Sequence, residues 1–221
     1  MSKNIKIGLI DYEAGNLFAI YNACIKVGAS PEVITKSHKN FDKFDILIIP
    51  GVGSFHAAME KIKKFGMYEK IIKFKNTGKT ILGICLGMQL LTTKSYEGKE
   101  TRGFDFIEAE VTFIKEDINK IKKDDKICIP INGWNSVFFN NNNKELLLNL
   151  QNENNFEDFY FIHSYWIKNI NKKYLIGETF YRNHSYCSCF KIENIIGVQF
   201  HPERSSVKGL IFLKNAFNLK C

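Results

Sequence analysis

Apolar runs alternate with segments of helical spacing through the first half of this chain. The apolar runs, which read as strands, are residues 5–10, 32–35, 46–49 and 80–84. The helix-like segments are residues 15–27, a segment capped by Ser54 and running to about residue 64, residues 67–76 and residues 86–93. Strands that alternate with helices make right-handed crossovers. The pattern therefore predicts an α/β chain with a parallel sheet and helices on both of its faces.

The second half has a different pattern, in which short strand-like runs follow one another directly. These runs are residues 106–114, 126–130, 158–162, 174–179, 186–191 and 195–200, and they predict antiparallel hairpins. Asparagine-rich stretches at residues 140–143 and 152–155 predict polar surface loops. Ser205 is expected to cap a closing helix that runs to about residue 217. The whole predicts a mixed, mostly parallel central sheet flanked by helices, with an added antiparallel hairpin region.

One cysteine lies where a strand is expected to turn into a helix. Cys85 stands in Gly-Ile-Cys-Leu-Gly, with Gly83 and Gly87 two residues to either side. This is the thiol version of the nucleophile elbow, in which small residues allow a strained turn that exposes the nucleophile. Backbone N–H groups at the start of a helix also favour the reactive thiolate. Cys85 is therefore a candidate nucleophile, with a small buried core residue as the structural alternative.

Two other motifs lie just after strand-like runs, where parallel sheets bind ligands. His201 and Glu203 follow the run that ends at Phe200, and Pro50-Gly51-Val52-Gly53 follows residues 46–49. The carboxyl ends of these strands are expected to meet at one edge of the sheet. Nucleophile, base, carboxylate and glycine-rich turn make a complete set for acyl transfer.

These motifs resemble those of the class I glutamine amidotransferases, whose fold is flavodoxin-like. A narrower resemblance is to the glutaminase subunits of imidazole glycerol phosphate synthase, and it extends from residue 6 to about residue 217. The segments that carry it are Asp11-Tyr12, Gly15-Asn16-Leu17, Pro50-Gly51-Val52-Gly53-Ser54-Phe55, Ala58-Met59, Gly133-Trp134-Asn135 and His163-Ser164-Tyr165.

The resemblance implies a triad of Cys85, His201 and Glu203. Cys85 would attack the side-chain amide of glutamine, His201 would transfer the proton, and Glu203 would orient the imidazole. The resemblance implies no cofactor and no metal ion. It further implies that the oxyanion is stabilised by Gly51, Val52, Gly53 and Leu86, and that glutamine is bound by Gln89, Glu97, Ser164 and Tyr165. His163 is left open between a core residue and a cleft residue.

The same resemblance also implies a partner subunit. Ammonia would pass to a (β/α)8-barrel cyclase subunit, which forms imidazole glycerol phosphate and AICAR in histidine biosynthesis. Free ammonia is mostly protonated at neutral pH, so a dry passage preserves it as a nucleophile. The residues expected to face this partner are Asn16, Trp134 and Arg204.

The sequence also departs from the family pattern close to that face. Ile131 and Asn132 stand where His and Met are usual, and Phe18-Ala19 stands where Arg-Ser is common. A paralogous glutaminase that feeds ammonia to amidination or amination of a surface-glycan sugar is therefore a second hypothesis. A non-enzymatic regulatory module is disfavoured because the triad is intact, and a peptidase or deglycase is disfavoured by Gln89.

Composition restricts the remaining classes of function. A chain of 221 residues with 45% hydrophobic residues is long enough for one substantial core, so one domain over residues 1–221 is expected. The net charge of +8 is spread over dispersed lysines, which indicates a solvated surface rather than nucleic-acid binding. The six scattered cysteines do not form a disulfide framework, and neither a signal peptide nor a membrane span is recognised. We therefore expect a cytoplasmic protein.

Overall fold

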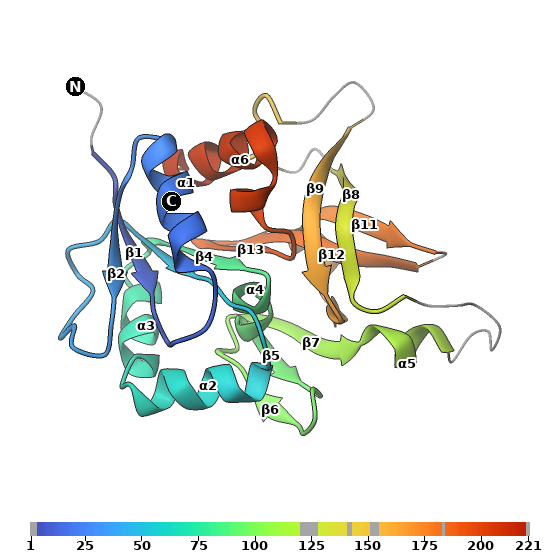
Figure 1. Cartoon of the computed structure of the whole chain (residues 1–221), viewed down its shortest axis with the longest axis horizontal. Helices are drawn as coiled ribbons and strands as arrows, with labels where there is room; N and C mark the ends of the chain where they lie inside the picture. Colours follow the sequence, from blue (N-terminus) through green and yellow to red (C-terminus); the bar gives the residue numbers. More distant parts are fainter. Residues whose placement is uncertain (1–3, 120–127, 141–142, 151–154, 183, 220–221) are drawn as a thin grey trace.

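A computed structural model describes residues 4–119, 128–140, 143–150, 155–182 and 184–219 (Figure 1). Its main sheet has the strand order β2-β1-β3-β4-β13-β12-β11-β8-β9. The first five of these strands are parallel to one another. They are β2 (Ser30–Ile34), β1 (Lys6–Ile10), β3 (Ile46–Ile49), β4 (Thr80–Ile84) and β13 (Ile195–Val198).

The remaining four strands of this sheet are antiparallel. They are β12 (His184–Ile192), β11 (Leu175–Tyr181), β8 (Ile131–Phe139) and β9 (Phe156–His163). Strand β13 joins the two halves, because it pairs parallel with β4 and antiparallel with β12. The expected mixed sheet with an antiparallel region is therefore present.

Helices cover both faces of the parallel half (Figure 1). The first hydrophobic core receives side chains from α1 (Leu17–Lys26) and α6 (Ser206–Asn218), and the second from α2 (Phe55–Lys64) and α3 (Tyr68–Lys75). The alternation within β3 explains the two cores: Ile46 and Ile48 point into the first, and Leu47 and Ile49 into the second.

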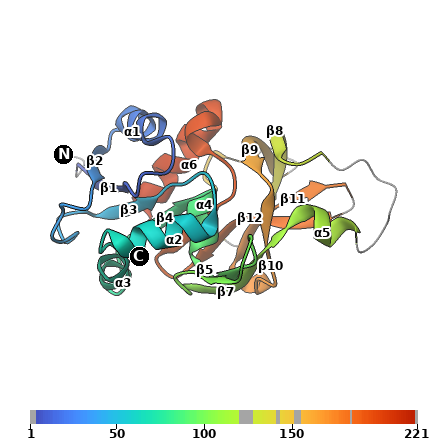
Figure 2. The same ribbon diagram turned by 60° about the horizontal axis from the view of Figure 1, so that its bottom comes forward.

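A second, smaller sheet has the order β10-β7-β5-β6 (Figure 2). Its strands are β10 (Tyr165–Lys168), β7 (Ile107–Phe113), β5 (Thr92–Ser95) and β6 (Thr101–Arg102). The remaining elements are α4 (Leu86–Leu90), α5 (Ile114–Asn119) and the short 3-10 helices η1 (Lys172–Tyr174) and η2 (Pro202–Arg204). Among the described residues, no helix has the length and apolar character that crossing a membrane requires.

Several predicted boundaries were wrong. The helix expected over residues 86–93 ends at Leu90, and Thr92 begins β5, because β-branched residues favour extended backbone. The strand expected at residues 126–130 is absent from residues 128–130, and residues 126–127 lie outside the described residues. Strand β8 begins at Ile131 instead. The asparagine-rich loops also fall partly outside, at residues 141–142 and 152–154.

Candidate active site

Cys85 occupies the sharp turn between β4 and α4. Its backbone has φ 54° and ψ −110°, a conformation that non-glycine residues rarely adopt, and its N–H donates to Val198 O over 2.7 Å. A Cβ on Gly87 would lie 1.7 Å from Ile49 O, and one on Gly83 would lie 2.7 Å from Gly87 O. Both flanking glycines are therefore needed because backbone segments approach closely on either side of the turn.

His201 and Glu203 lie at the same end of the sheet as Cys85. This follows from the parallel pairing of β4 with β13, in which Ile84 lies opposite Val198. The His201 N–H donates to Tyr160 O over 2.9 Å, which fixes the backbone of His201 against β9. The His201 Nδ1 atom lies 2.7 Å from Glu203 Oε1, and both side chains are buried. The carboxylate therefore holds one edge of the imidazole.

The electrostatics of His201 are unusual for a buried histidine. Burial by itself lowers the pKa of His201, but interactions with Cys85 and then with Glu203 outweigh burial and raise it to about 10. The Nε2 atom of the ring is buried and makes no hydrogen bond to any described residue. His201 thus holds its proton at neutral pH, and its interaction with Cys85 falls to the Nε2 edge, since Glu203 takes Nδ1.

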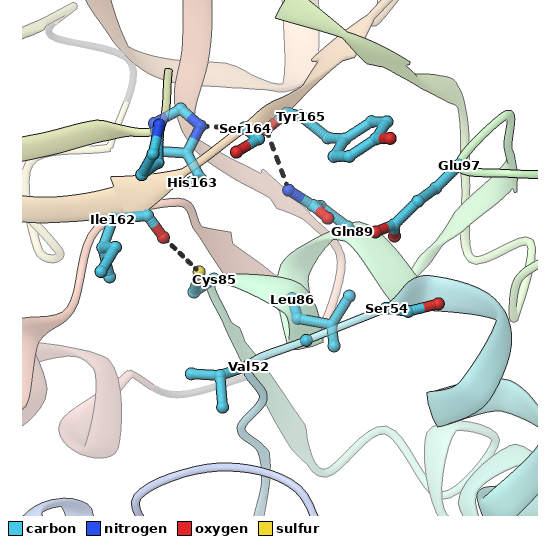
Figure 3. Close-up of a pocket in the computed structure, with 12 residues that line it drawn as sticks. Val52, Ser54, Cys85, Leu86, Gln89, Glu97, Ile162, His163, Ser164 and Tyr165 are labelled. Carbon is cyan, nitrogen blue, oxygen red and sulfur yellow. Dashed lines mark hydrogen bonds between the residues drawn. The ribbon is translucent and has the colours of Figure 1, made fainter. Parts of the chain in front are cut away.

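A cavity of about 460 Å³ opens beside Cys85 (Figure 3). A volume of this size accommodates a small amino acid. The residues that line it are Val52, Gly53, Ser54, Cys85, Leu86, Gln89, Glu97, Pro130, Ile162, His163, Ser164 and Tyr165. The cavity therefore gathers the candidate nucleophile with all of the residues that the sequence proposed for glutamine binding.

Gln89 and Glu97 are fixed by hydrogen bonds to other parts of the chain. Gln89 Nε2 donates to Tyr165 O over 3.1 Å, so the main-chain oxygen of Tyr165 is already used within the protein. Glu97 Oε2 accepts the Phe55 N–H over 2.7 Å at the first turn of α2. In Figure 3 the Gln89 oxygen lies on the side of Glu97. This wall of the cavity therefore presents hydrogen-bond acceptors.

The glycine-rich turn forms another part of the cavity wall. Val52 is 47% exposed, and Gly53 has φ +99°. The Tyr12 hydroxyl donates to Pro50 O over 2.5 Å and so anchors the start of the turn. Gly51 lies just outside the large cavity and lines a smaller one of about 110 Å³. The oxyanion role of Gly51, Val52, Gly53 and Leu86 stays a prediction.

Two of the three residues expected to face a partner line the smaller cavity. Asn16 and Arg204 line it together with His201 and Glu203. Asn16 also caps α1, because its Oδ1 accepts the Ala19 N–H over 3.2 Å. Trp134 is 54% exposed. Trp134 and Arg204 both pack against the Tyr160 ring, at 6.4 Å between ring centroids and 4.2 Å from the guanidinium carbon.

Sequence reasoning missed the side-chain roles of two residues. Gln199 is fully buried, and its Nε2 lies 3.6 Å from Cys85 Sγ. The polar side chain of Gln199 inside the apolar run that ends at Phe200 is the feature of the sequence that could have indicated a role for it. The Ser205 hydroxyl was expected to cap α6, but it makes no such bond. It donates to His201 O over 2.6 Å and accepts the Tyr160 N–H over 3.0 Å, which ties His201 to β9.

His163 is a buried histidine at the cavity wall. Its Nδ1 lies 2.9 Å from Tyr165 O, which fixes Nδ1 as the protonated atom, since a carbonyl oxygen only accepts. Burial lowers the pKa of His163, the Tyr165 contact partly opposes this, and the charge of His201 adds a smaller lowering, so that the pKa is about 4. His163 therefore stays neutral at physiological pH.

We expect His163 to make the fold sensitive to acid. The unfolded histidine takes up a proton near pH 6.5, but the folded one does so only near pH 4, so stability is lost as the pH falls between these values. The His163→Gln variant should lose about 2 kcal/mol less stability than the wild type between pH 7 and pH 5. Urea unfolding at both pH values measures this difference, and equal losses would contradict it.

The fold, with a thiol at its strand-to-helix turn, is the arrangement that thiol-dependent acyl-transfer enzymes use. The family model described as glutamine amidotransferase class-I matches residues 8–218. The chain therefore belongs to the class-I glutamine amidotransferases and, within them, to the family of the HisH subunits of imidazole glycerol phosphate synthase.

Three relatives illustrate this membership. Imidazole glycerol phosphate synthase subunit HisH 1 of Campylobacter jejuni is 39% identical over 216 residues, which cover 95% of this chain and 98% of the relative. Subunit HisH of Wolinella succinogenes is 38% identical over 211 residues, which cover 95% of this chain and 97% of the relative. Subunit HisH of Aquifex aeolicus is 34% identical over 207 residues, which cover 94% of this chain and 93% of the relative. The resemblance recognised in the sequence is confirmed.

Solved structures agree on the fold. PurLQS from Thermotoga maritima aligns with a TM-score of 0.71 at 17% identity and covers 97% of this chain and 98% of that one. A crystal structure of a glutamine amidotransferase aligns with a TM-score of 0.69 at 16% identity, with 95% and 98% covered. The predicted fold class is confirmed.

Proposed function

We propose that this chain is the glutaminase subunit of an imidazole glycerol phosphate synthase in histidine biosynthesis. The observation that carries the proposal is the position of Cys85, at a strained turn beside a cavity and near a buried imidazole–carboxylate pair. The names of the relatives favour the histidine pathway over the surface-glycan pathway. We further propose a single domain over residues 1–221 and a cytoplasmic setting, in which Cys85 stays reduced.

The first chemical step would be attack by Cys85. The sulfur, as thiolate, forms a bond to the side-chain amide carbon of glutamine, and the amide oxygen takes up negative charge. Donors aimed at this oxygen lower the barrier, each by about 3 to 4 kcal/mol. The Leu86 N–H at the start of α4 and the N–H groups of Gly51, Val52 and Gly53 are the candidates. The exposed position of Val52 is consistent with a turn that reorients.

The second step would be departure of ammonia. His201, which holds its proton at neutral pH, donates that proton from Nε2 to the leaving nitrogen, and the carbon–nitrogen bond breaks to leave a thioester on Cys85. Water then attacks the thioester, His201 takes up a proton from this water, and glutamate leaves. Glu203 stabilises the imidazolium through its contact with Nδ1.

The cavity wall suggests how glutamine would be held. The oxygens of Gln89 and Glu97 are hydrogen-bond acceptors, which suits them to the α-ammonium group of the substrate. Ser164 and Tyr165 line the same cavity and would contribute main-chain contacts. The substrate side-chain amide would then extend toward Cys85.

The smaller cavity supports a route from the site to a partner. Val52 and Ile162 line both cavities, and Asn16 and Arg204 line only the smaller one. Ammonia would leave along this side, into a (β/α)8-barrel cyclase subunit that covers Asn16, Trp134 and Arg204. Tryptophan and arginine are among the residue types that are enriched at interface hot spots.

The partner gives the test of this proposal. The isolated chain should hydrolyse glutamine slowly, and a barrel subunit with its ligand bound should accelerate it, because the oxyanion donors are completed only in the complex. The measurement is glutamate release by the chain alone, with empty partner and with liganded partner. Equal rates in all three mixtures would mean a free-standing glutaminase and would overturn the proposal.

A variant at the proposed interface sharpens this test. Trp134→Ala should weaken activation by the partner at least about tenfold while leaving the midpoint of thermal unfolding nearly unchanged, because the indole is largely exposed. The matched control is Leu148→Ala, which removes an apolar side chain that is 60% exposed beside the C-terminal part of α6. Equal activation of the two variants would contradict the assignment of Trp134.

A further inference from the structure

Two buried side-chain amides, hydrogen-bonded in series, connect the glutamine cavity to the candidate nucleophile. Gln89 Nε2 donates to Tyr165 O over 3.1 Å and to Gln199 Oε1 over 3.0 Å. Gln199 Nε2 in turn donates to Cys85 Sγ over 3.6 Å. Gln199 is fully buried and comes from the segment after β13, a part of the chain remote in sequence from Gln89.

The main-chain oxygen of Tyr165 fixes the orientation of both of these side-chain amides. A main-chain carbonyl oxygen only accepts, so the nitrogen of Gln89 must face Tyr165 O. The same nitrogen then donates to Gln199, which must present its oxygen there. The remaining nitrogen of Gln199 is left to face Cys85 Sγ. No different assignment satisfies all three contacts.

We propose that Gln199 has two functions in glutamine hydrolysis: it donates an N–H to the sulfur of Cys85, and it positions Gln89 so that the Gln89 oxygen faces the substrate cavity. The donor function stabilises the thiolate, since a hydrogen bond to a charged group is stronger than one to a neutral group. The positioning function occupies the nitrogen of Gln89 and leaves its oxygen for the substrate ammonium.

The two functions have separate readouts, because one concerns the sulfur and the other the substrate. In Gln199→Met, which has a similar shape but no amide, alkylation of Cys85 by iodoacetamide at pH 7 should slow about tenfold, and its pH profile should move to higher pH. Mass spectrometry of the Cys85 peptide measures this without glutamine or partner. Gln89→Met should slow alkylation less than Gln199→Met does, because Gln89 acts on the sulfur only through the orientation of Gln199.

The positioning function is tested by KM for glutamine in the presence of the partner. Gln199→Met should raise KM, and adding it to Gln89→Met should raise KM no further, because Gln199 acts on the substrate through Gln89. Additive effects on KM would overturn the positioning function. The KM experiment rests on the proposed function, whereas the alkylation experiment does not. A wild-type complex without glutaminase activity would overturn only the proposed function.

A second variant and a control cover the case in which Gln199→Met does not fold. Gln199→Glu keeps the shape and the acceptor toward Gln89 but removes the N–H that faces sulfur, so it should slow alkylation and leave KM near the wild-type value. The control is Ser188→Ala, which breaks a buried side-chain hydrogen bond of 2.7 Å to Thr179 but keeps the Ser188 main-chain oxygen that accepts the Gln199 N–H. Wild-type alkylation in Gln199→Glu, or slowed alkylation in Ser188→Ala, would overturn the donor function.

Discussion

Replacing Cys85 with alanine is expected to abolish glutamine hydrolysis. Removal of a catalytic nucleophile typically lowers kcat by about 10⁴-fold or more, because the covalent route is lost and only binding and electrostatic assistance remain. The small side chain suits the strained turn no worse than cysteine does, so the fold should persist. Glutamate release in the presence of the liganded partner measures the loss.

A second buried cysteine supplies the control for this experiment. Cys189 lies in β12 in the first hydrophobic core, where burial raises the pKa of its thiol above its usual range. Cys189→Ala should lower stability through a small cavity and keep most of the activity. Full activity in Cys85→Ala, or loss of activity in both variants, would refute Cys85 as the nucleophile.

The second large effect is expected at the imidazole–carboxylate pair, where the two residues should contribute unequally. His201→Asn removes proton transfer and should lower kcat by about 10²- to 10⁴-fold. Glu203→Gln keeps the imidazole and loses only its orienting charge, so its loss should be smaller by about tenfold or more. Turnover in the complex separates the two, and equal or reversed losses would rule out this division of roles.

The Glu203→Gln variant should also change the pH profile. The charge of Glu203 helps to raise the pKa of His201 to about 10, so its removal should lower that pKa. His201 must be protonated to donate to ammonia, and activity in the variant should therefore decline at a lower alkaline pH than in the wild type. An unchanged alkaline limb would show that Glu203 does not act on His201 in this way.

The structure also explains why some elements could be predicted from the sequence and others could not. Strand β3 matched its expected bounds because four consecutive apolar residues point into two cores. Strand β8 was missed, because Gly133 and Asn135 interrupt its alternation and Trp134 on its outer face is apolar. Its identity as a strand comes from pairing with β9 and β11 rather than from its own pattern.

The sequence by itself determined the elements whose cause is local. The glycines beside Cys85 allow a turn that no larger residue fits, and the motif can therefore be recognised from a few neighbouring residues. The pairing of β4 with β13 decided that His201 lies at the same end of the sheet as Cys85. Burial and contact with Cys85 and Glu203 set the pKa of His201, and the contacts of Gln199 join segments far apart in the chain. Only the tertiary structure decides such features, because burial and long-range hydrogen bonds exist only once the separate segments have packed together.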